Sequence, residues 1–161
     1  MSMKNPRLLD TLSRRRLLIA AGQGGAVVAT MTLLPGRLRA EFPSVDEAIK
    51  AVTGDASPAE GRIVLTLPQI AENGNTVPIE ISVDSAMSDS DYVKSVHIFA
   101  DGNPNPNVAT YHFTPANGEA HLATRIRLAK TQNIIAIAEM SNGDLYMAKS
   151  EIKVTIGGCG G

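Results

Sequence analysis

The side chain in this sequence that is best suited to covalent chemistry is a thiol close to the C-terminus. Cys159 is the only cysteine among the 161 residues. Glycines flank it on both sides: Gly157, Gly158, Gly160 and Gly161. Glycine adds no side-chain bulk and leaves φ and ψ open, and five residues extend over at most about 17 Å. The pattern predicts a flexible arm over residues 157–161 that presents one sulfur atom to the active sites of other proteins.

Nothing close in the sequence would activate this thiol. Lys153 lies six residues before Cys159, and the terminal carboxylate of Gly161 would oppose formation of the thiolate. The thiolate is the reactive form of cysteine, and an unactivated thiol is mostly protonated at neutral pH. We therefore expect the reactivity to come from visiting enzymes. The alternative is an incidental cysteine at a disordered chain end.

The three histidines are the next candidates for a site. If residues 115–118 form a four-residue hairpin loop, His112 lies opposite His121, and the two imidazoles could bind a metal weakly. No third ligand is placed beside them, so we favour a polar or partner-facing sheet surface that includes Tyr111. His97 lies alone in an apolar strand and is interpreted as structural.

The remaining constellations are weaker still. Asp84, Asp89 and Asp91 surround a serine-rich turn, but they lack the spacing and the central glycine of a calcium loop. The sequence has no defensible Ser–His–Asp order, no glycine-rich phosphate loop after a strand and no Cys-x-x-Cys pair. It therefore predicts no catalytic residue, no metal site and no cofactor.

The first 40 residues are interpreted as an export signal and not as folded structure. Residues 13–19 (SRRRLLI) resemble the twin-arginine export signature, and a weakly apolar stretch follows over residues 17–34. The alternative is a membrane anchor, because eighteen apolar residues are near the minimum needed to span a bilayer. The glycines in this stretch and Pro35-Gly36 favour a signal that is removed after Ala40. We therefore predict export to the periplasm.

Removal of this signal changes the charge of the chain. Of its 15 Lys and Arg residues and 16 Asp and Glu residues, seven and one lie in the first 40, so eight face fifteen in the remainder and its net charge is −7. An acidic domain without basic clusters is a poor candidate for binding nucleic acid or an anionic membrane. An export route for folded proteins also favours a partner that is acquired before export.

The mature part begins with a helix signal. Ser44 and Glu47 form a capping box, and the apolar side chains Val45, Ala48, Ile49 and Val52 lie on one helical face. The helix is expected to end by Gly54.

From Gly61 onward the pattern alternates as in β-strands. Seven strand-like runs are separated by Asn-Gly and Asp-Gly turns, at residues 63–67, 77–83, 93–100, 108–113, 120–128, 134–140 and 145–156. Asn142-Gly143 predicts a tight hairpin with positive φ at both residues. The sequence therefore predicts an all-β, immunoglobulin-like antiparallel sandwich over residues 41–156, with a short N-terminal helix.

Several segments of the mature chain resemble the SoxY family of thiosulfate-oxidation sulfur carriers. They are the terminal GGCGG after EIKVTI (151–156), ENGNTVP (72–78), HIFA (97–100), VATYHFTP (108–115) and TRIRL (124–128). The resemblance implies a carrier and not an enzyme, with the carrier cysteine at Cys159 and a sandwich that forms a heterodimer with SoxZ.

The resemblance also implies a cycle on the cysteine. The haem enzyme SoxAX couples thiosulfate to Cys159 as an S-thiosulfonate, and SoxB releases sulfate to leave a persulfide. Where the sulfur dehydrogenase SoxCD is present, it oxidises the remaining sulfur, and SoxB regenerates the thiol.

Two alternatives remain for the function. The tail cysteine could form an intermolecular disulfide in a structural or interaction protein, or the chain could itself be an enzyme, which nothing in the sequence supports. For a flexible arm, valine at Gly157 and Gly158 is expected to leave folding intact and to impair processing by partners.

Overall fold

The computed structural model describes residues 42–158. The predicted helix is present as α2 (Val45–Thr53). The Ser44 hydroxyl accepts a hydrogen bond from the backbone N–H of Glu47 (3.2 Å), and the Glu47 carboxylate accepts one from the backbone N–H of Ser44 (2.8 Å). Gly54, at φ +62°, closes the C-terminus and donates its N–H to the carbonyl of Lys50. The capping box and the helix boundaries are confirmed.

Eight strands follow the helix, and a single turn of 3-10 helix (η1, Pro115–Asn117) joins the fifth strand to the sixth. The strands are β1 (Ile63–Thr66), β2 (Ile70–Asn73), β3 (Val77–Val83), β4 (Val93–Ala100), β5 (Asn107–His112), β6 (Ala120–Ile126), β7 (Gln132–Met140) and β8 (Leu145–Ile156). The sequence predicted seven of these and missed β2, a four-residue strand with only one buried side chain, Ala71.

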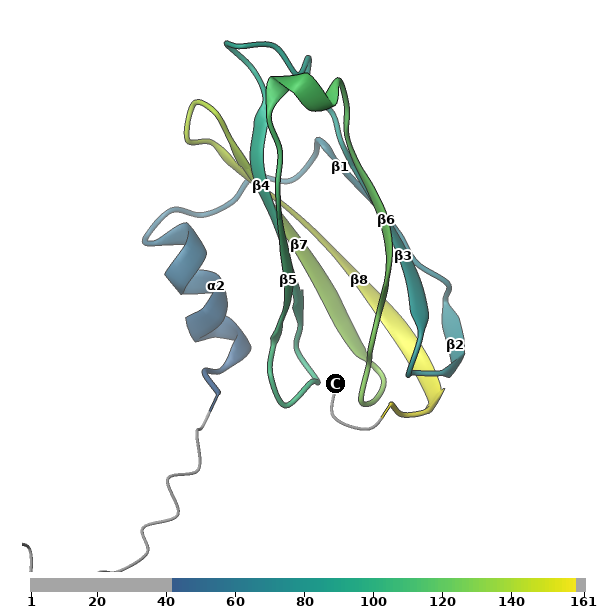
Figure 1. Cartoon of the computed structure of the whole chain (residues 1–161). Coiled ribbons are helices and arrows are strands. Elements are labelled where there is room, and N and C mark those ends of the chain that lie inside the picture. Colours follow the sequence, from purple (N-terminus) through teal and green to yellow (C-terminus); the bar gives the residue numbers. More distant parts are fainter. Residues whose placement is uncertain (1–41, 159–161) are drawn as a thin grey trace, which may run out of the picture. The chain divides into compact units, whose positions relative to one another are not determined.

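The strands form two sheets, with the orders β1-β3-β6 and β2-β8-β7-β4-β5 (Figure 1). Every pair is antiparallel except β2 with β8, which is parallel. The prediction of an immunoglobulin-like sandwich is confirmed. The seven predicted strands pair in antiparallel fashion as expected, and the unpredicted β2 adds one parallel pair at the edge of the large sheet, beside β8.

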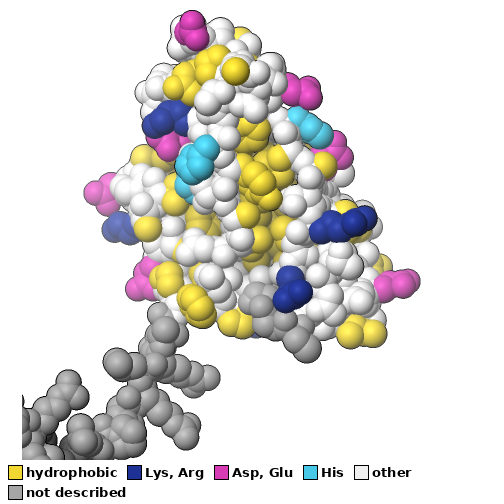
Figure 2. Space-filling view, in the orientation of Figure 1, with side chains coloured by type: hydrophobic (Ala, Val, Ile, Leu, Met, Phe, Trp, Pro, Cys, Tyr) yellow, Lys and Arg dark blue, Asp and Glu magenta, His cyan; other side chains and the backbone are white. Residues whose placement is uncertain are grey.

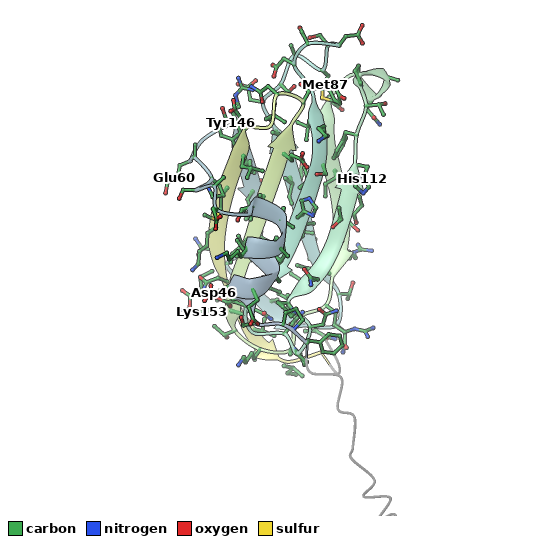
Figure 3. The ribbon with its side chains drawn as sticks, turned by 90° about the vertical axis from the view of Figure 1, so that its left-hand side faces the viewer. Asp46, Glu60, Met87, His112, Tyr146 and Lys153 are labelled. Carbon is green, nitrogen blue, oxygen red and sulfur yellow. The ribbon has the colours of Figure 1, made fainter. Side chains whose placement is uncertain are left out.

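The apolar core lies between the sheets and contains alternate side chains of β3, β4, β6, β7 and β8. A second cluster covers the outer face of the large sheet, where Ala48 of α2 packs on Phe99, Ile135 and Ile137 (Figure 3). Strand β7 is therefore buried on both faces, which explains its unbroken apolar run. No helix within residues 42–158 is long and apolar enough to cross a membrane.

The connection from β5 to β6 differs from the prediction. These strands belong to different sheets, so η1 crosses from one sheet to the other and does not close a hairpin. Both strands are sheet edges, and Figure 2 shows apolar side chains gathered along the opening on this face. Val108, Ala109, Tyr111 and Ile126 line the lower part of this opening as a groove.

The turn between β7 and β8 also departs from the prediction. Gly143 has φ +90°, whereas Asn142 has an ordinary negative φ. The Gly143 N–H donates to the carbonyl of Met140, and the Met140 N–H donates to the carbonyl of Asp144. A three-residue loop with one left-handed glycine replaces the predicted two-residue turn.

Candidate functional site

The predicted thiol, Cys159, lies outside the described residues together with Gly160 and Gly161. The structure does describe the point where the arm is attached. Strand β8 ends at Ile156, and Gly157 and Gly158 continue from it. We call these two glycines, with the loop segments that they contact around Gly74 and over residues 127–130, the arm root.

Backbone hydrogen bonds join three parts of the chain at the arm root. The Gly74 N–H, in the β2–β3 turn, donates to the carbonyl of Ile156 (2.7 Å). The Leu128 N–H, in the β6–β7 connection, donates to the carbonyl of Gly74 (2.8 Å), and the Gly158 N–H donates to the carbonyl of Leu128 (2.8 Å). The residue before Cys159 is therefore held to the sandwich by its own backbone.

The glycines of the arm root have no room for a side chain. A Cβ on Gly157 would lie 2.0 Å from the carbonyl oxygen of Ala129, and one on Gly158 would lie 2.8 Å from Cγ of Arg127. A Cβ on Gly74 would lie 2.2 Å from the carbonyl oxygen of Leu128. Close approach of the backbone, and not a positive φ, is what requires glycine at these positions.

These contacts correct two sequence-based predictions. Gly157 and Gly158 were predicted as part of a flexible arm that leaves the fold after Ile156, but both pack against the β6–β7 connection and Gly158 is buried. Valine at these positions was expected to leave folding intact, whereas the close neighbours of a Cβ on either glycine lead us to expect a loss of stability. No local signal distinguishes a packed glycine from an unrestrained one, so the sequence could not reveal this.

The segment that receives the glycines is held by two amide side chains. Asn103 donates to the carbonyl of Arg127 (2.9 Å) and accepts from the N–H of Ala129 (2.9 Å). Gln132, only 4% exposed, donates to Asn103 Oδ1 (2.9 Å) and to the carbonyl of Lys130 (3.1 Å). The sequence did not identify either residue as part of a site.

Three basic side chains lie at or near the arm root. Arg127 lies against Gly158, Lys130 follows the Ala129 that contacts Gly157, and Lys153 lies three residues before the end of β8 (Figure 3). The ion pairs found within residues 42–158 involve Lys50, Arg62, Lys94 and His121. None of them includes the three basic residues at the root, so these are available to an anion.

A separate polar cluster lies on the outer face of the large sheet. Ser95 Oγ is 3.0 Å from Nε2 of His97 and donates to Glu139 (3.3 Å), and Nδ1 of His97 is 3.0 Å from Oγ1 of Thr110. Burial lowers the pKa of His97, the nearby Glu139 carboxylate opposes this shift and His112 adds to it. Ser95 is only 3% exposed, and its hydroxyl is engaged by His97 and Glu139. The cluster stabilises the sheet, consistent with the structural role predicted for His97.

The other histidines do not meet. His112 pairs with Ser95 in the large sheet, whereas His121 pairs with Ser82 in the small sheet and lies 2.9 Å from Glu80. The predicted pairing of these imidazoles is wrong because β5 and β6 never pair. Within residues 42–158, no three metal-ligating side chains gather in one place. The Asp91 carboxylate accepts hydrogen bonds from Arg62 and from the backbone N–H of Ala86, which belongs to the same loop.

The comparisons with known proteins point to one family. A family profile described as "Sulfur oxidation protein SoxY" matches residues 49–159, a range that ends on the lone cysteine. The structure of the sulfur carrier protein SoxY from Chlorobium limicola f thiosulfatophilum is similar, with 32% sequence identity and a TM-score of 0.59 over 70% of this chain and 97% of that chain. A comparison with curated protein sequences gave no match.

A second structural likeness concerns the fold alone. The superoxide reductase (neelaredoxin) from Ignicoccus hospitalis has a TM-score of 0.53 and 17% identity, over 58% of this chain and 80% of that chain. At this identity, a shared sandwich carries no argument about chemistry.

Proposed function

Because the chain belongs to the SoxY family of sulfur oxidation proteins, we propose that it carries sulfur intermediates covalently on Cys159 while partner enzymes convert them. The observation that carries the proposal is the lone thiol placed one residue beyond the arm root. A carrier must present one sulfur atom to several active sites in turn. A thiol at the tip of a short chain end meets that need better than a thiol on a strand.

The first step loads the carrier. The Cys159 sulfur forms a bond to the outer sulfur of thiosulfate, the thiol proton goes to solvent and two electrons pass to the haem of the partner SoxAX. The product is a cysteine S-thiosulfonate, which has one negative charge. This chain supplies the thiol, and the haem enzyme supplies the oxidant.

The next steps unload sulfate. In the SoxB step, water attacks the sulfur atom of the terminal sulfonate, and the bond from that atom to the sulfane sulfur breaks. Sulfate and a proton are released, and a persulfide remains on Cys159. In organisms with the sulfur dehydrogenase SoxCD, the persulfide takes up the oxygen atoms of three waters, six electrons pass to that enzyme and seven protons go to solvent, which gives a cysteine S-sulfonate. A second hydrolysis then releases sulfate and restores the thiol.

The charge at the arm root supports this assignment. The thiosulfonate and sulfonate adducts are anions, and a net charge of −7 on the mature chain would repel them. Arg127, Lys130 and Lys153 place positive charge where the arm leaves the fold. These side chains lower the cost of bringing a negative group back toward the protein.

The remaining parts of the proposal concern the localisation of the chain and its partner subunit. The twin-arginine signal over residues 1–40, which lies outside the described residues, would deliver the chain to the periplasm. A heterodimer with SoxZ, formed before export, would account for the use of a route for folded proteins. The chain itself acts as a carrier and binds no resident cofactor.

The proposal is tested by intact-mass analysis after incubation with thiosulfate and the haem enzyme. The parent chain is expected to gain the mass of one thiosulfate group, and Cys159→Ser is expected to gain none. An adduct on Cys159→Ser, or the absence of one on the parent, contradicts the proposal. If Cys159 instead forms a working intermolecular disulfide, Cys159→Ser loses assembly while thiosulfate turnover by the system persists.

A further inference from the structure

Two side chains stand out among the buried residues of the described chain because they are polar. Ser95 and Gln132 are the buried polar residues within residues 42–158, at 3% and 4% exposure. Ser95 belongs to the cluster with His97 on the outer face of the large sheet. Gln132 lies at the first residue of β7, directly after the connection that receives the arm.

Both the oxygen and the nitrogen of the Gln132 side-chain amide have hydrogen-bond partners. Its oxygen accepts from the N–H of Gly102 (2.7 Å), and its nitrogen donates to Asn103 Oδ1 (2.9 Å) and to the carbonyl of Lys130 (3.1 Å). A buried amide with no partner would be destabilising, whereas one with all partners present fixes its neighbours in a single geometry. Gln132 thereby orients the side chain of Asn103.

Asn103 then holds the two peptide groups on either side of Leu128. Its nitrogen donates to the carbonyl of Arg127 and its oxygen accepts from the N–H of Ala129, each at 2.9 Å. The backbone N–H and carbonyl of Leu128 remain available to other segments. Its N–H donates to Gly74, and its carbonyl accepts from Gly158.

The contacts form one path from the core to the residue that precedes the thiol. We infer that Asn103 and Gln132 are positioning residues for Cys159: they fix the Leu128 peptide that holds Gly158, and so set the point from which the chain continues to the thiol. This inference rests on the proposed carrier function. Consecutive Cα atoms lie about 3.8 Å apart, so a fixed Gly158 fixes the origin of Cys159.

The amides have a role that apolar packing does not supply. The side chain of Leu128 is fully buried and anchors the β6–β7 connection in the core by itself. A buried side chain does not fix how the adjoining peptide planes are turned, whereas hydrogen bonds to the flanking carbonyl and N–H groups do. Removal of the Asn103 or Gln132 amide is therefore expected to weaken the hydrogen bond from Gly158 to Leu128 more than it lowers the stability of the fold.

The test uses the fact that Cys159 is the only cysteine, so that a nitroxide label attaches there alone. Asn103→Ala and Gln132→Leu are expected to increase the mobility of the label and to speed hydrogen exchange of the Gly158 amide about tenfold. Ser95→Ala removes the other buried polar side chain and serves as the matched control. It is expected to lower the melting temperature without changing either readout at the arm.

A conservative variant separates positioning from general loosening. Asn103→Asp keeps the acceptor for Ala129 but cannot donate to Arg127, so its label mobility should fall between those of the parent and Asn103→Ala. Parent-like mobility and exchange in both Asn103→Ala and Gln132→Leu overturn the inference. Equal changes in Ser95→Ala overturn it as well.

A chemical readout keeps this inference separate from the carrier proposal. Tetrathionate transfers a thiosulfonate group to a thiol without an enzyme, releasing thiosulfate and a proton. Its rate with Asn103→Ala should equal or exceed that of the parent, whereas loading by the haem enzyme should slow several-fold. If the parent is never loaded by that enzyme while label mobility still depends on Asn103, the carrier proposal fails and the positioning of the thiol stands. If loading succeeds on every variant at the parent's rate, the positioning role fails and the carrier proposal stands.

Discussion

The two ends of the sandwich use glycine for opposite reasons. At the end that contains the turn between β7 and β8, Gly61, Gly118 and Gly143 have positive φ values of +99°, +75° and +90°, and a Cβ on any of them would meet nothing within 4 Å. At the other end, where β8 ends (Figure 1), Gly74, Gly157 and Gly158 have ordinary φ values, and a Cβ would overlap neighbouring atoms.

The difference teaches what each end does. Glycines with positive φ let a loop turn in open solvent, where the neighbouring residues are free to vary. Glycines in close contact let three backbone segments approach one another, and their spacing depends on every partner. The end that carries the thiol is the end where the backbone is most tightly packed, although the sequence suggested that it would be the loosest.

The largest expected effect is at Gly74. Gly74→Ala places a methyl group 2.2 Å from the carbonyl oxygen of Leu128, inside a turn whose neighbours on both sides are strands. Overpacking costs about 1–3 kcal/mol, and a backbone atom that cannot move away puts this site at about 3 kcal/mol. Denaturant unfolding measures the change. A loss below about 1 kcal/mol would mean that the arm root is less tightly packed than the open end.

The next effect is at Gly157. Gly157→Ala meets the carbonyl oxygen of Ala129, but a residue near the chain end can lift away from it. The expected cost is about 1–2 kcal/mol, which includes the lost hydrogen bond of Gly158. The rate of hydrogen exchange of the Gly158 amide should increase together with this loss of stability. Unchanged protection of that amide would contradict the seating of the arm root.

The two ends should respond differently to the size of the new side chain. At Gly118, which has φ +75° and ψ −34°, any side chain strains the backbone but a Cβ meets nothing within 4 Å, so Gly118→Ala and Gly118→Asn should each cost roughly 1 kcal/mol. At Gly157 the larger asparagine side chain should be worse than alanine, because a Cβ there already overlaps the carbonyl oxygen of Ala129. Melting curves of the four variants test the difference. A clear preference for alanine over asparagine at both positions would remove the distinction between the two ends.

The smallest effect concerns pH. Burial lowers the pKa of His97, so its contribution to stability is complete above its unfolded pKa and is lost as pH falls through the region below about 6.5. His97 lies within β4, and its hydrogen bonds go to Ser95 and Thr110 and not to the arm root, so label mobility at Cys159 should stay constant while stability declines. His97→Gln should flatten the decline in denaturant unfolding between pH 7.5 and 5.5. An increase in label mobility over the same pH range would show that the His97 cluster and the arm root are coupled, and would contradict this prediction.

Much of the fold follows from local sequence patterns. Ser44 and Glu47 specify the start of the helix, and runs of apolar residues specify seven of the eight described strands, because a capping box or a strand face depends on residues only a few positions apart. The lone cysteine and the acidic charge of residues 41–161 are likewise read directly from the sequence. These features were enough to direct attention to the end of the chain.

Other features depend on residues far apart in the sequence. Strand β2 forms because β8 offers it an edge, and His112 and His121 separate because β5 and β6 join different sheets.

The sequence by itself determined which atom is the candidate for covalent chemistry, since Cys159 is the only residue of the chain with a thiol. The tertiary structure decided how that thiol is attached. Gly157 and Gly158 are seated by Gly74 and by the loop that Asn103 and Gln132 hold, and these residues meet only when the sheets have formed. A glycine has the same sequence letter in an open tether as under a carbonyl 2.0 Å from its missing Cβ, and only the folded backbone distinguishes the two.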